Sequence, residues 1–134
     1  MGYELLAHTA DIKVALRAPD LAGLYQAAAD MVREVLVGSS AVAEEVLLVI
    51  PPEGAAPSEA FFRFVRELFY LYDVERFLPS RVVGLSPPTV AGEAFDPERH
   101  VPQRHVKAVT RHQYDFRGGR GGRGGYTAEM VLDL

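Results

Sequence analysis

The chain has 134 residues and a mass of 14.7 kDa, which predicts one domain spanning residues 1–134 and leaves too little chain for a second domain of ordinary size. It contains no cysteine, so disulfide-rich secreted scaffolds, thiolate nucleophiles and Cys-ligated zinc or iron–sulfur sites are excluded. The formal net charge of -4 combines a net charge of -8 over residues 1–98 with +4 over residues 99–134, so phosphate contacts are expected in the last quarter.

The first residues, MGYELL, carry the acidic Glu4 and lack the basic and apolar regions of a signal peptide. No apolar run approaches the roughly 18 residues of a membrane span. These patterns predict a soluble cytoplasmic protein without a membrane partner.

Two strands and a helix are predicted in the first third of the chain. Residues 3–16 alternate loosely, and Ile12, Val14 and Leu16 fall on one face of a strand that follows a shorter one. Asp20 stands at an N-cap position, and apolar residues at helical spacing then predict a helix over residues 21–37 that stops at Gly38. The apolar run in EEVLLVIPP predicts a buried strand next.

The second helix is predicted from Ser58, a candidate N-cap, through FFRFVRELFYLYD, whose wide apolar stripe indicates a core helix. Short strands are expected at residues 81–86 and 89–95, a long strand at 104–116, and a last strand in YTAEMVLDL. The order β-β-α-β-α-β-β-β-β predicts an α+β fold, a two-layer sandwich of two helices packed on a mixed or antiparallel sheet.

The first candidate functional residues are His8 and Asp11, which stand three residues apart among small side chains in AHTAD. The small neighbouring side chains would let a ligand come close to the backbone and to the Asp11 carboxylate. The alternative is a pair that only forms a hydrogen bond within a turn, which is the more common role of a neighbouring His and Asp.

The last two residues bring Asp133 next to the α-carboxylate of Leu134, a set of oxygen atoms that suits a hard cation such as Ca²⁺ or Mg²⁺. If the fold places Asp11 beside them, the three carboxylates repel one another unless a cation lies among them. The alternative is an ordinary solvated chain end.

Lys107 lies between His105 and His112 in HVKAVTRH and is one of only two lysines among fourteen basic residues. A lysine there suits a point charge for one anion or a proton-transfer role. A solvated surface lysine is the alternative.

The tract RGGRGGRGG, residues 117–125, precludes a regular helix or strand and places Arg117, Arg120 and Arg123 on a loop that can contact RNA phosphates or bases. The other interpretation is a flexible, soluble hairpin loop without a ligand. No Walker, Rossmann, GxSxG or HExxH pattern occurs in the sequence.

Four motifs, YELLAHTADIKV, RFVRELFYLYD, VKAVTRH and EMVLDL, resemble in the same order the archease family, small proteins that assist the RtcB-type RNA-splicing ligase. That ligase joins 3′-phosphate or cyclic-phosphate ends to 5′-hydroxyl ends, as in tRNA splicing. The resemblance implies a protein cofactor rather than an enzyme, one that speeds guanylylation of the ligase and allows multiple turnover.

The resemblance also implies a divalent metal, usually calcium, held by Asp11, Asp133 and Leu134, and an essential Lys107, with His8 as a further candidate. Two residues depart from the family pattern. Lys13 puts a cation near the expected metal site, and Arg111 replaces an aromatic residue before His112.

Three functional hypotheses follow. In the first, the acidic tip of Asp11, Asp133 and Leu134 acts with its cation at the ligase active site, where charge neutralisation assists phosphoryl transfer. In the second, an RNA-binding chaperone or modulator of tRNA-modifying enzymes uses the basic last quarter and the glycine–arginine tract to contact tRNA or other RNA. In the third, a small metal-dependent hydrolase uses His8 as its base.

Overall fold

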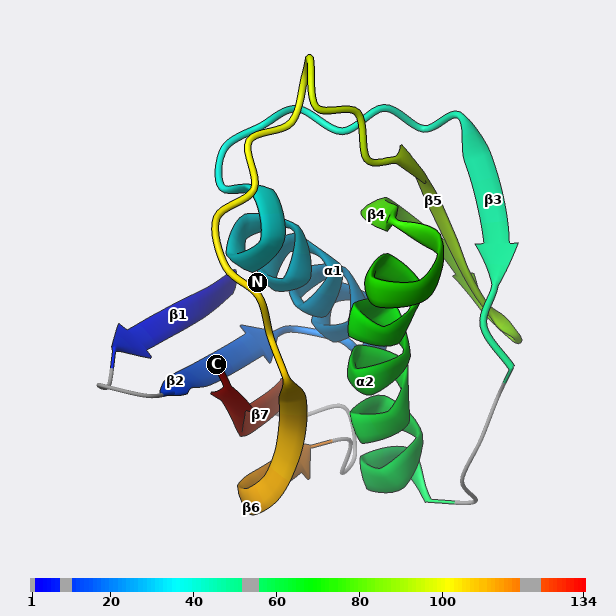
Figure 1. The fold of residues 1–134 in the computed structure, drawn as a ribbon. Helices are drawn as coiled ribbons and strands as arrows, with labels where there is room; N and C mark the ends of the chain where they lie inside the picture. Colours follow the sequence, from blue (N-terminus) through cyan, green and yellow to red (C-terminus); the bar gives the residue numbers. More distant parts are fainter. Residues whose placement is uncertain (1, 8–10, 52–55, 119–123) are drawn as a thin grey trace. The chain divides into compact units, whose positions relative to one another are not determined.

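The computed structural model describes residues 2–7, 11–51, 56–118 and 124–134 (Figure 1). The elements follow the predicted order: β1 (Gly2–Ala7), β2 (Asp11–Ala18), α1 (Leu21–Val37), β3 (Val46–Val49), α2 (Pro57–Glu75), β4 (Phe77–Leu85), β5 (Pro88–Ala94), β6 (Ala108–Gly118) and β7 (Tyr126–Asp133).

Contacts along the chain define two compact units. Unit 1 comprises Met1–Ala28 and His105–Leu134, and unit 2 comprises Ala29–Arg104. The interpretation of the whole chain as one domain stays a prediction. Within the described residues, neither helix combines the length and the apolar character needed to cross a membrane.

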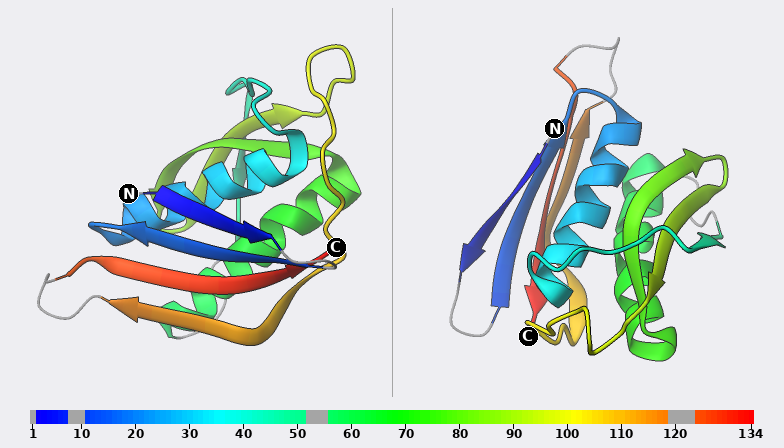
Figure 2. Two further views of the ribbon diagram at one scale, coloured as in Figure 1. Left: turned by 90° about the vertical axis from the view of Figure 1, so that its left-hand side faces the viewer. Right: turned by 90° about the horizontal axis from the view of Figure 1, so that it is seen from above.

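Unit 1 is built on a four-stranded antiparallel sheet with the strand order β1-β2-β7-β6, seen side by side in Figure 2. The predicted alternation in β2 is confirmed, because Ile12, Val14 and Leu16 are at most 2% exposed. We call the opposite face, which carries Asp11 and Arg17, the outer face of the sheet. The two ends of β7, at Tyr126 and Asp133, lie at opposite ends of this sheet.

The helix α1 begins in unit 1 and ends in unit 2, with the predicted bounds. Asp20 caps it as expected: its Oδ1 accepts a hydrogen bond from the backbone N–H of Gly23 at 2.7 Å, which satisfies a donor that the first turn leaves unpaired. Gly38 ends the helix with a left-handed φ of 60°, a conformation that costs glycine little.

Unit 2 contains a three-stranded antiparallel sheet with the order β3-β5-β4, together with α2. The strand predicted in EEVLLVIPP is β3, but the prediction that it is buried was wrong, because β3 lies at the edge of this sheet and Val46, Leu47 and Val49 are exposed. The α+β class and its two helices are as predicted, but the strands are divided between two antiparallel sheets instead of one. Hydrophobic periodicity sets the face of a strand and not its neighbour, so the pattern could not reveal this division.

The helix α2 begins at Pro57, one residue before the predicted cap. Ala56 occupies the N-cap position without a side-chain hydrogen bond, so the capping role expected for Ser58 was wrong. Proline suits the first helical position because its fixed φ matches the helix and its missing N–H would be unpaired there. The predicted apolar stripe is confirmed, since seven residues of the helix are buried: Phe61, Phe62, Phe64, Val65, Leu68, Phe69 and Tyr72.

Candidate functional site

Asp11 and Asp133 are register partners at one end of the sheet in unit 1, on the adjacent strands β2 and β7. Residues directly opposite each other in an antiparallel pair project on the same face, with Cα atoms about 4.5–5.5 Å apart. The fold therefore brings the two carboxylates to one place on the outer face, as the metal hypothesis requires. Two neighbouring carboxylates repel each other unless a cation or a proton compensates their charge.

Lys107 lies at the same end of the sheet. Its backbone N–H donates a hydrogen bond to the carbonyl oxygen of Asp133 at 2.7 Å, and Ala108, the next residue, is the register partner of Asp133 on β6. The Lys107 side chain is exposed. The three predicted residues Asp11, Lys107 and Asp133 thus come together from three different strands or strand ends.

The donor set at this corner fits a hard divalent cation. Asp11 and Asp133 are opposite each other on adjacent strands, and Leu134, which carries the third predicted carboxylate, follows Asp133 directly. Among the residues that the structure describes, no three His, Asp or Glu side chains converge on one point, so the remaining donors would be a terminal carboxylate, backbone carbonyls or water. His8 lies outside the described residues.

Lys13 lies two residues from Asp11 on the same face, and its Nζ is 3.6 Å from the carboxylate of Glu129. Both side chains of this pair are partly exposed, so the ion pair stabilises the fold by at most about 1 kcal/mol. Val131 is the register partner of Lys13, and Glu129 lies two residues beyond Val131 along β7, farther from Asp133, so the ion pair directs the Lys13 cation away from Asp11.

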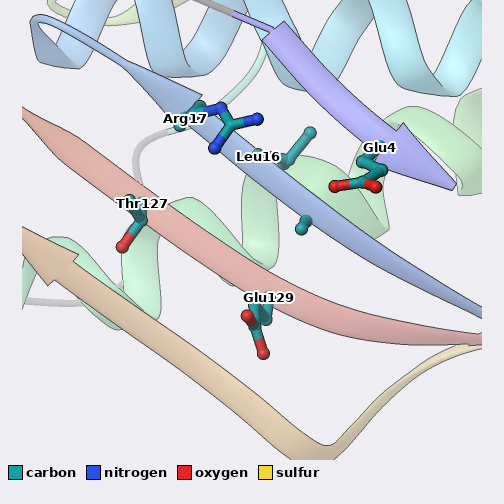
Figure 3. A pocket seen from close by; sticks show the side chains of 6 residues that line it. Glu4, Leu16, Arg17, Thr127 and Glu129 are labelled. Atoms are coloured by element: carbon teal, nitrogen blue, oxygen red, sulfur yellow. The ribbon is translucent and has the colours of Figure 1, made fainter. Parts of the chain in front are cut away.

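A shallow hollow of about 110 Å³ opens on the outer face between Glu4 and Glu129 (Figure 3). These two residues flank Ala15 in one register row across β1, β2 and β7, and the small Ala15 side chain leaves the space between them. Arg17 and Thr127, which form the next row, line the same hollow. Rows with acidic and with basic side chains therefore succeed one another along this face.

The glycine–arginine tract begins at the other end of β7. Its first residue, Arg117, lies in β6 and not on a loop as predicted, because it is the register partner of Thr127. Its Nε lies 2.8 Å from the Asp115 carboxylate. Arg120 and Arg123 lie outside the described residues. Because β7 has eight residues, this end is about 24 Å from Asp133, so Arg117 lies far from the predicted acidic tip.

Gly118, Gly125 and Tyr126 lie where β6 ends and β7 begins, and we call this closely packed group the neck. A Cβ atom at Gly118 would lie 2.4 Å from the carbonyl oxygen of Gly125, and one at Gly125 would lie 2.5 Å from the carbonyl oxygen of Ala18. Both glycines also have positive φ angles, of 133° and 66°. Glycine is therefore required at both positions, for space and for backbone conformation.

The model of the archease protein family (MTH1598/TM1083) matches residues 3–134. The chain belongs to the archease family. The resemblance drawn from the four sequence motifs is thereby confirmed over nearly the whole chain.

Individual archeases align along most of their length. The archease of Pyrococcus furiosus is 29% identical over 141 residues, which cover 98% of this chain and 98% of that protein. The archease of Sulfolobus acidocaldarius is 29% identical over 118 residues, with 83% and 85% covered.

Two solved structures share the α+β fold. The solution structure of Methanobacterium thermoautotrophicum protein 1598 superposes with a TM-score of 0.73 at 26% identity, covering 99% of each chain. The crystal structure of an archease from Thermotoga maritima, described as a possible chaperone, has a TM-score of 0.69 at 21% identity and covers 96% of this chain and 94% of its own. At that identity the Thermotoga structure supports the fold alone.

One feature that the sequence did not reveal is a wide bulge in β6. Between the register pairs Thr110↔Val131 and Asp115↔Glu129, β6 has the four residues 111–114 where β7 has only Met130. Gln113 in this segment has a left-handed φ of 63°, which is uncommon for a residue other than glycine. The bulge carries Arg111 and His112 and interrupts the strand. The strand predicted over residues 104–116 also begins later than expected, at Ala108.

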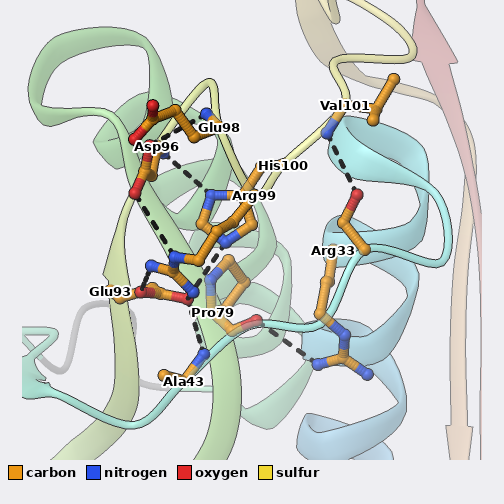
Figure 4. Close-up of polar contacts among 10 residues, drawn as sticks. Arg33, Ala43, Pro79, Glu93, Asp96, Glu98, Arg99, His100 and Val101 are labelled. Carbon is orange, nitrogen blue, oxygen red and sulfur yellow. Dashed lines mark hydrogen bonds and ion pairs between the residues drawn. The ribbon is translucent and has the colours of Figure 1, made fainter.

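A buried polar cluster in unit 2 was also missed (Figure 4). The Glu93 side chain is 2% exposed, and its Oε2 accepts hydrogen bonds from the Ala43 backbone N–H at 2.7 Å and from Arg99 at 3.0 Å. Arg99 also bonds to Oε1. Chiefly because of Arg99, the pKa of Glu93 is lowered to about 2. The cluster joins the segment before β3 to the chain that follows β5.

His100, 1% exposed, completes the cluster. Its Nδ1 accepts a hydrogen bond from the Asp96 backbone N–H at 2.9 Å, so in the neutral ring the hydrogen is on Nε2, which lies 3.0 Å from Glu93 Oε2 and donates to it. Every buried side-chain polar atom of the described residues has a hydrogen-bond partner, so the cluster has a structural role. Only the pattern of an acid and a histidine near prolines hinted at it in the sequence.

Proposed function

We propose that this archease activates an RNA ligase that joins 3′-phosphate and 5′-hydroxyl ends in tRNA splicing, by promoting guanylylation of the ligase and its repeated turnover. The observation that carries the proposal is the register pairing of Asp11 with Asp133, next to Lys107. In this role the protein is a cofactor of the ligase and not itself an enzyme. Membership of the archease family supports the proposal but does not name a ligase as the partner.

The acidic residues would bind a divalent metal, with calcium as the expected ion. Asp11 and Asp133 supply oxygen ligands from facing strands, and the α-carboxylate of Leu134 completes the proposed set. When bound, such an ion supplies positive charge that neutralises phosphate oxygens during nucleotidyl transfer. The short separation of the strands fixes the two aspartates relative to each other before any partner arrives.

Lys107 supplies a second positive charge at the same corner. Its backbone is fixed to Asp133 by the 2.7 Å hydrogen bond, while its exposed side chain is available to a partner or to a nucleotide phosphate. Phosphoryl transfer depends mainly on positioning and on charge neutralisation, so a small protein that contributes both at an enzyme's active site can raise its rate. The protein would act in the cytoplasm, where such a ligase works.

A guanylylation time course of the cognate ligase with GTP and divalent metal tests this function. Wild-type protein should accelerate guanylylation and turnover, whereas Asp11→Ala and Lys107→Ala should not. Glu4→Ala is the matched control, because it removes an exposed carboxylate from the same face away from Asp11. Full stimulation by a folded Asp11→Ala variant would contradict the proposal.

A second function, RNA binding by a chaperone or modulator of tRNA-modifying enzymes, is favoured by one observation. Arg17 and Arg117 occupy the same register row on either side of Thr127, at the end of the sheet where the glycine–arginine tract begins. Arg17 has no side-chain partner among the described residues. RNA binding that depends on these arginines, with no effect on any ligase, would favour this function over the first.

A further inference from the structure

The strand β3 forms an open, apolar edge of the sheet in unit 2. It pairs only with β5 among the described residues, and Figure 1 shows it at the margin of that sheet. In an antiparallel pair, alternate backbone N–H and C=O groups point to either side of a strand, so the groups of β3 that do not face β5 are left for another partner. Exposed edges of this kind are normally protected by charges, prolines or bulges within the strand.

The side chains of β3 make this edge unusual. Val46, Leu47 and Val49 are 47%, 64% and 60% exposed, and the strand contains no charged residue. Its ends are nevertheless fixed, because the N–H of Glu45 donates to the Gly92 carbonyl at 2.9 Å and the N–H of Ile50 donates to the Pro88 carbonyl at 2.8 Å. The strand is therefore a preformed template, and ordering it on binding costs little.

Charge at one end of β3 selects the partner. Glu44 is paired with Arg81 at 2.9 Å, but the exposed side chain of Glu45 has no partner among the described residues. The other end of the strand continues into Ile50, which is buried, and Pro51. The charged side chains beside them, Arg63 and Glu67 of α2, have opposite signs, and Arg63 is already paired with Glu59 at 2.7 Å. A matching segment would be apolar along its length and basic at the end beside Glu45.

We propose that β3 is a docking edge for an extended apolar segment of another protein, which adds to the sheet as a fourth strand antiparallel to β3 and places a lysine or arginine beside Glu45. Strand addition of this type obtains affinity from main-chain hydrogen bonds and specificity from alternate side chains. The antiparallel direction continues the pattern of this sheet and puts the basic residue at the C-terminal end of the segment.

A second copy of this chain fits the edge less well. Antiparallel pairing of two β3 strands would bring each Glu45 to the Ile50 end of the other copy, where the cation Arg63 is already paired with Glu59. The docking edge belongs to unit 2, so it is independent of the ligase function proposed for the carboxylates of unit 1.

The test uses a seven-residue acetylated and amidated peptide that alternates valine and threonine and ends in lysine. In an NMR titration of the full chain, shifts should concentrate in β3 and β5, and the amides of Val46–Val49 should gain protection from hydrogen exchange. Ending the peptide in glutamate should weaken binding about fivefold, the effect of roughly 1 kcal/mol from one cross-strand charge pair.

A charge swap separates docking from a structural role. Glu45→Lys should weaken binding of the lysine peptide and strengthen binding of the glutamate peptide by similar factors, and Leu47→Thr combined with Val49→Thr should weaken both. Glu75→Lys and Val74→Thr are the controls, because they make the same chemical changes at exposed positions of α2. No binding at millimolar peptide, shifts centred elsewhere, an ineffective swap, or self-association through β3 would each overturn the proposal.

Discussion

Asp11 and Arg17 lie on the same face of β2, six residues apart, so side chains of opposite charge mark the two ends of one strand about 20 Å from each other. Each charge is reinforced by the neighbouring strands. Asp133 lies opposite Asp11, while Arg117 shares the register row of Arg17. The sheet of unit 1 therefore separates a cation-binding candidate from an anion-binding candidate while holding both on one surface.

Replacement of Asp133 by asparagine should weaken divalent-cation binding by about tenfold or more, because a charged oxygen ligand is lost. The backbone carbonyl that accepts the Lys107 hydrogen bond is retained, so the strand end should remain in place. Calorimetric titration with Ca²⁺ and Mn²⁺ measures the effect. Glu4→Gln removes a carboxylate from another row of the same face and should leave affinity unchanged; an equal loss in both variants would show that only general charge is involved.

Removal of two arginines should weaken RNA binding at the other end of the sheet. For Arg17→Gln combined with Arg117→Gln, the salt dependence of binding to a single-stranded RNA should fall by as much as about 1.4 in slope, because each phosphate contact contributes about 0.7. Arg66→Gln, an exposed position on α2, is the control. An unchanged slope in the double variant would remove these arginines from the RNA surface.

Acid should act on unit 2 through Glu93. Its pKa is about 2 in the folded protein against an ordinary value of 4.5, so its contribution to stability is complete above about pH 4.5 and is lost as the pH falls toward 2. Glu93→Gln should lower the free energy of unfolding by about 2 kcal/mol at neutral pH and make it fall less steeply over that range. Urea unfolding at pH 7, 4.5 and 3 measures this.

Glu98→Gln serves as the reference for that experiment, because Glu98 is exposed and its side chain has no partner among the described residues. The pKa values of Asp96 and Glu44 are also lowered, so the decisive quantity is the difference between the two variants. Parallel stability curves for Glu93→Gln and Glu98→Gln would assign the acid sensitivity to other groups.

A methyl group at Gly118 should destabilise the neck. Gly118→Ala places its Cβ 2.4 Å from a backbone oxygen, and overpacking of this kind costs about 1–3 kcal/mol. At Gly124 the φ of 72° is also positive, but a Cβ would meet nothing within 4 Å, so Gly124→Ala should cost only the conformational strain of about 1 kcal/mol. Thermal unfolding compares the stabilities of the two variants. Equal losses of stability would mean that the close contacts at Gly118 add nothing to the cost of the substitution.

The sequence predicted local structure better than the pairing of its parts. The bounds of α1, the buried face of β2 and the apolar stripe of α2 follow from caps and periodicity, which act over a few residues. The division of the strands into two sheets could not be predicted, because strand neighbours are chosen by tertiary packing.

The same distinction applies to the candidate site. The motifs pointed to Asp11, Asp133 and Lys107 individually, and only the strand order β2-β7-β6 brings them together. The bulge in β6 could not be predicted from residues 111–114 alone, because a bulge depends on the pairing with the partner strand. Glu93 and His100 escaped because burial of a polar pair is decided by elements distant in the sequence.

The neck at Gly118, Gly125 and Tyr126 determines how the length of the glycine–arginine tract affects stability. Since both strand ends are fixed there, the number of residues beyond the neck affects stability mainly through loop closure, and doubling that number costs only about 0.6 kcal/mol. Insertions and changes of charge between the two strands are therefore nearly neutral for folding. The charge of this tract can thus be changed without altering the carboxylate pair at the far end of β7.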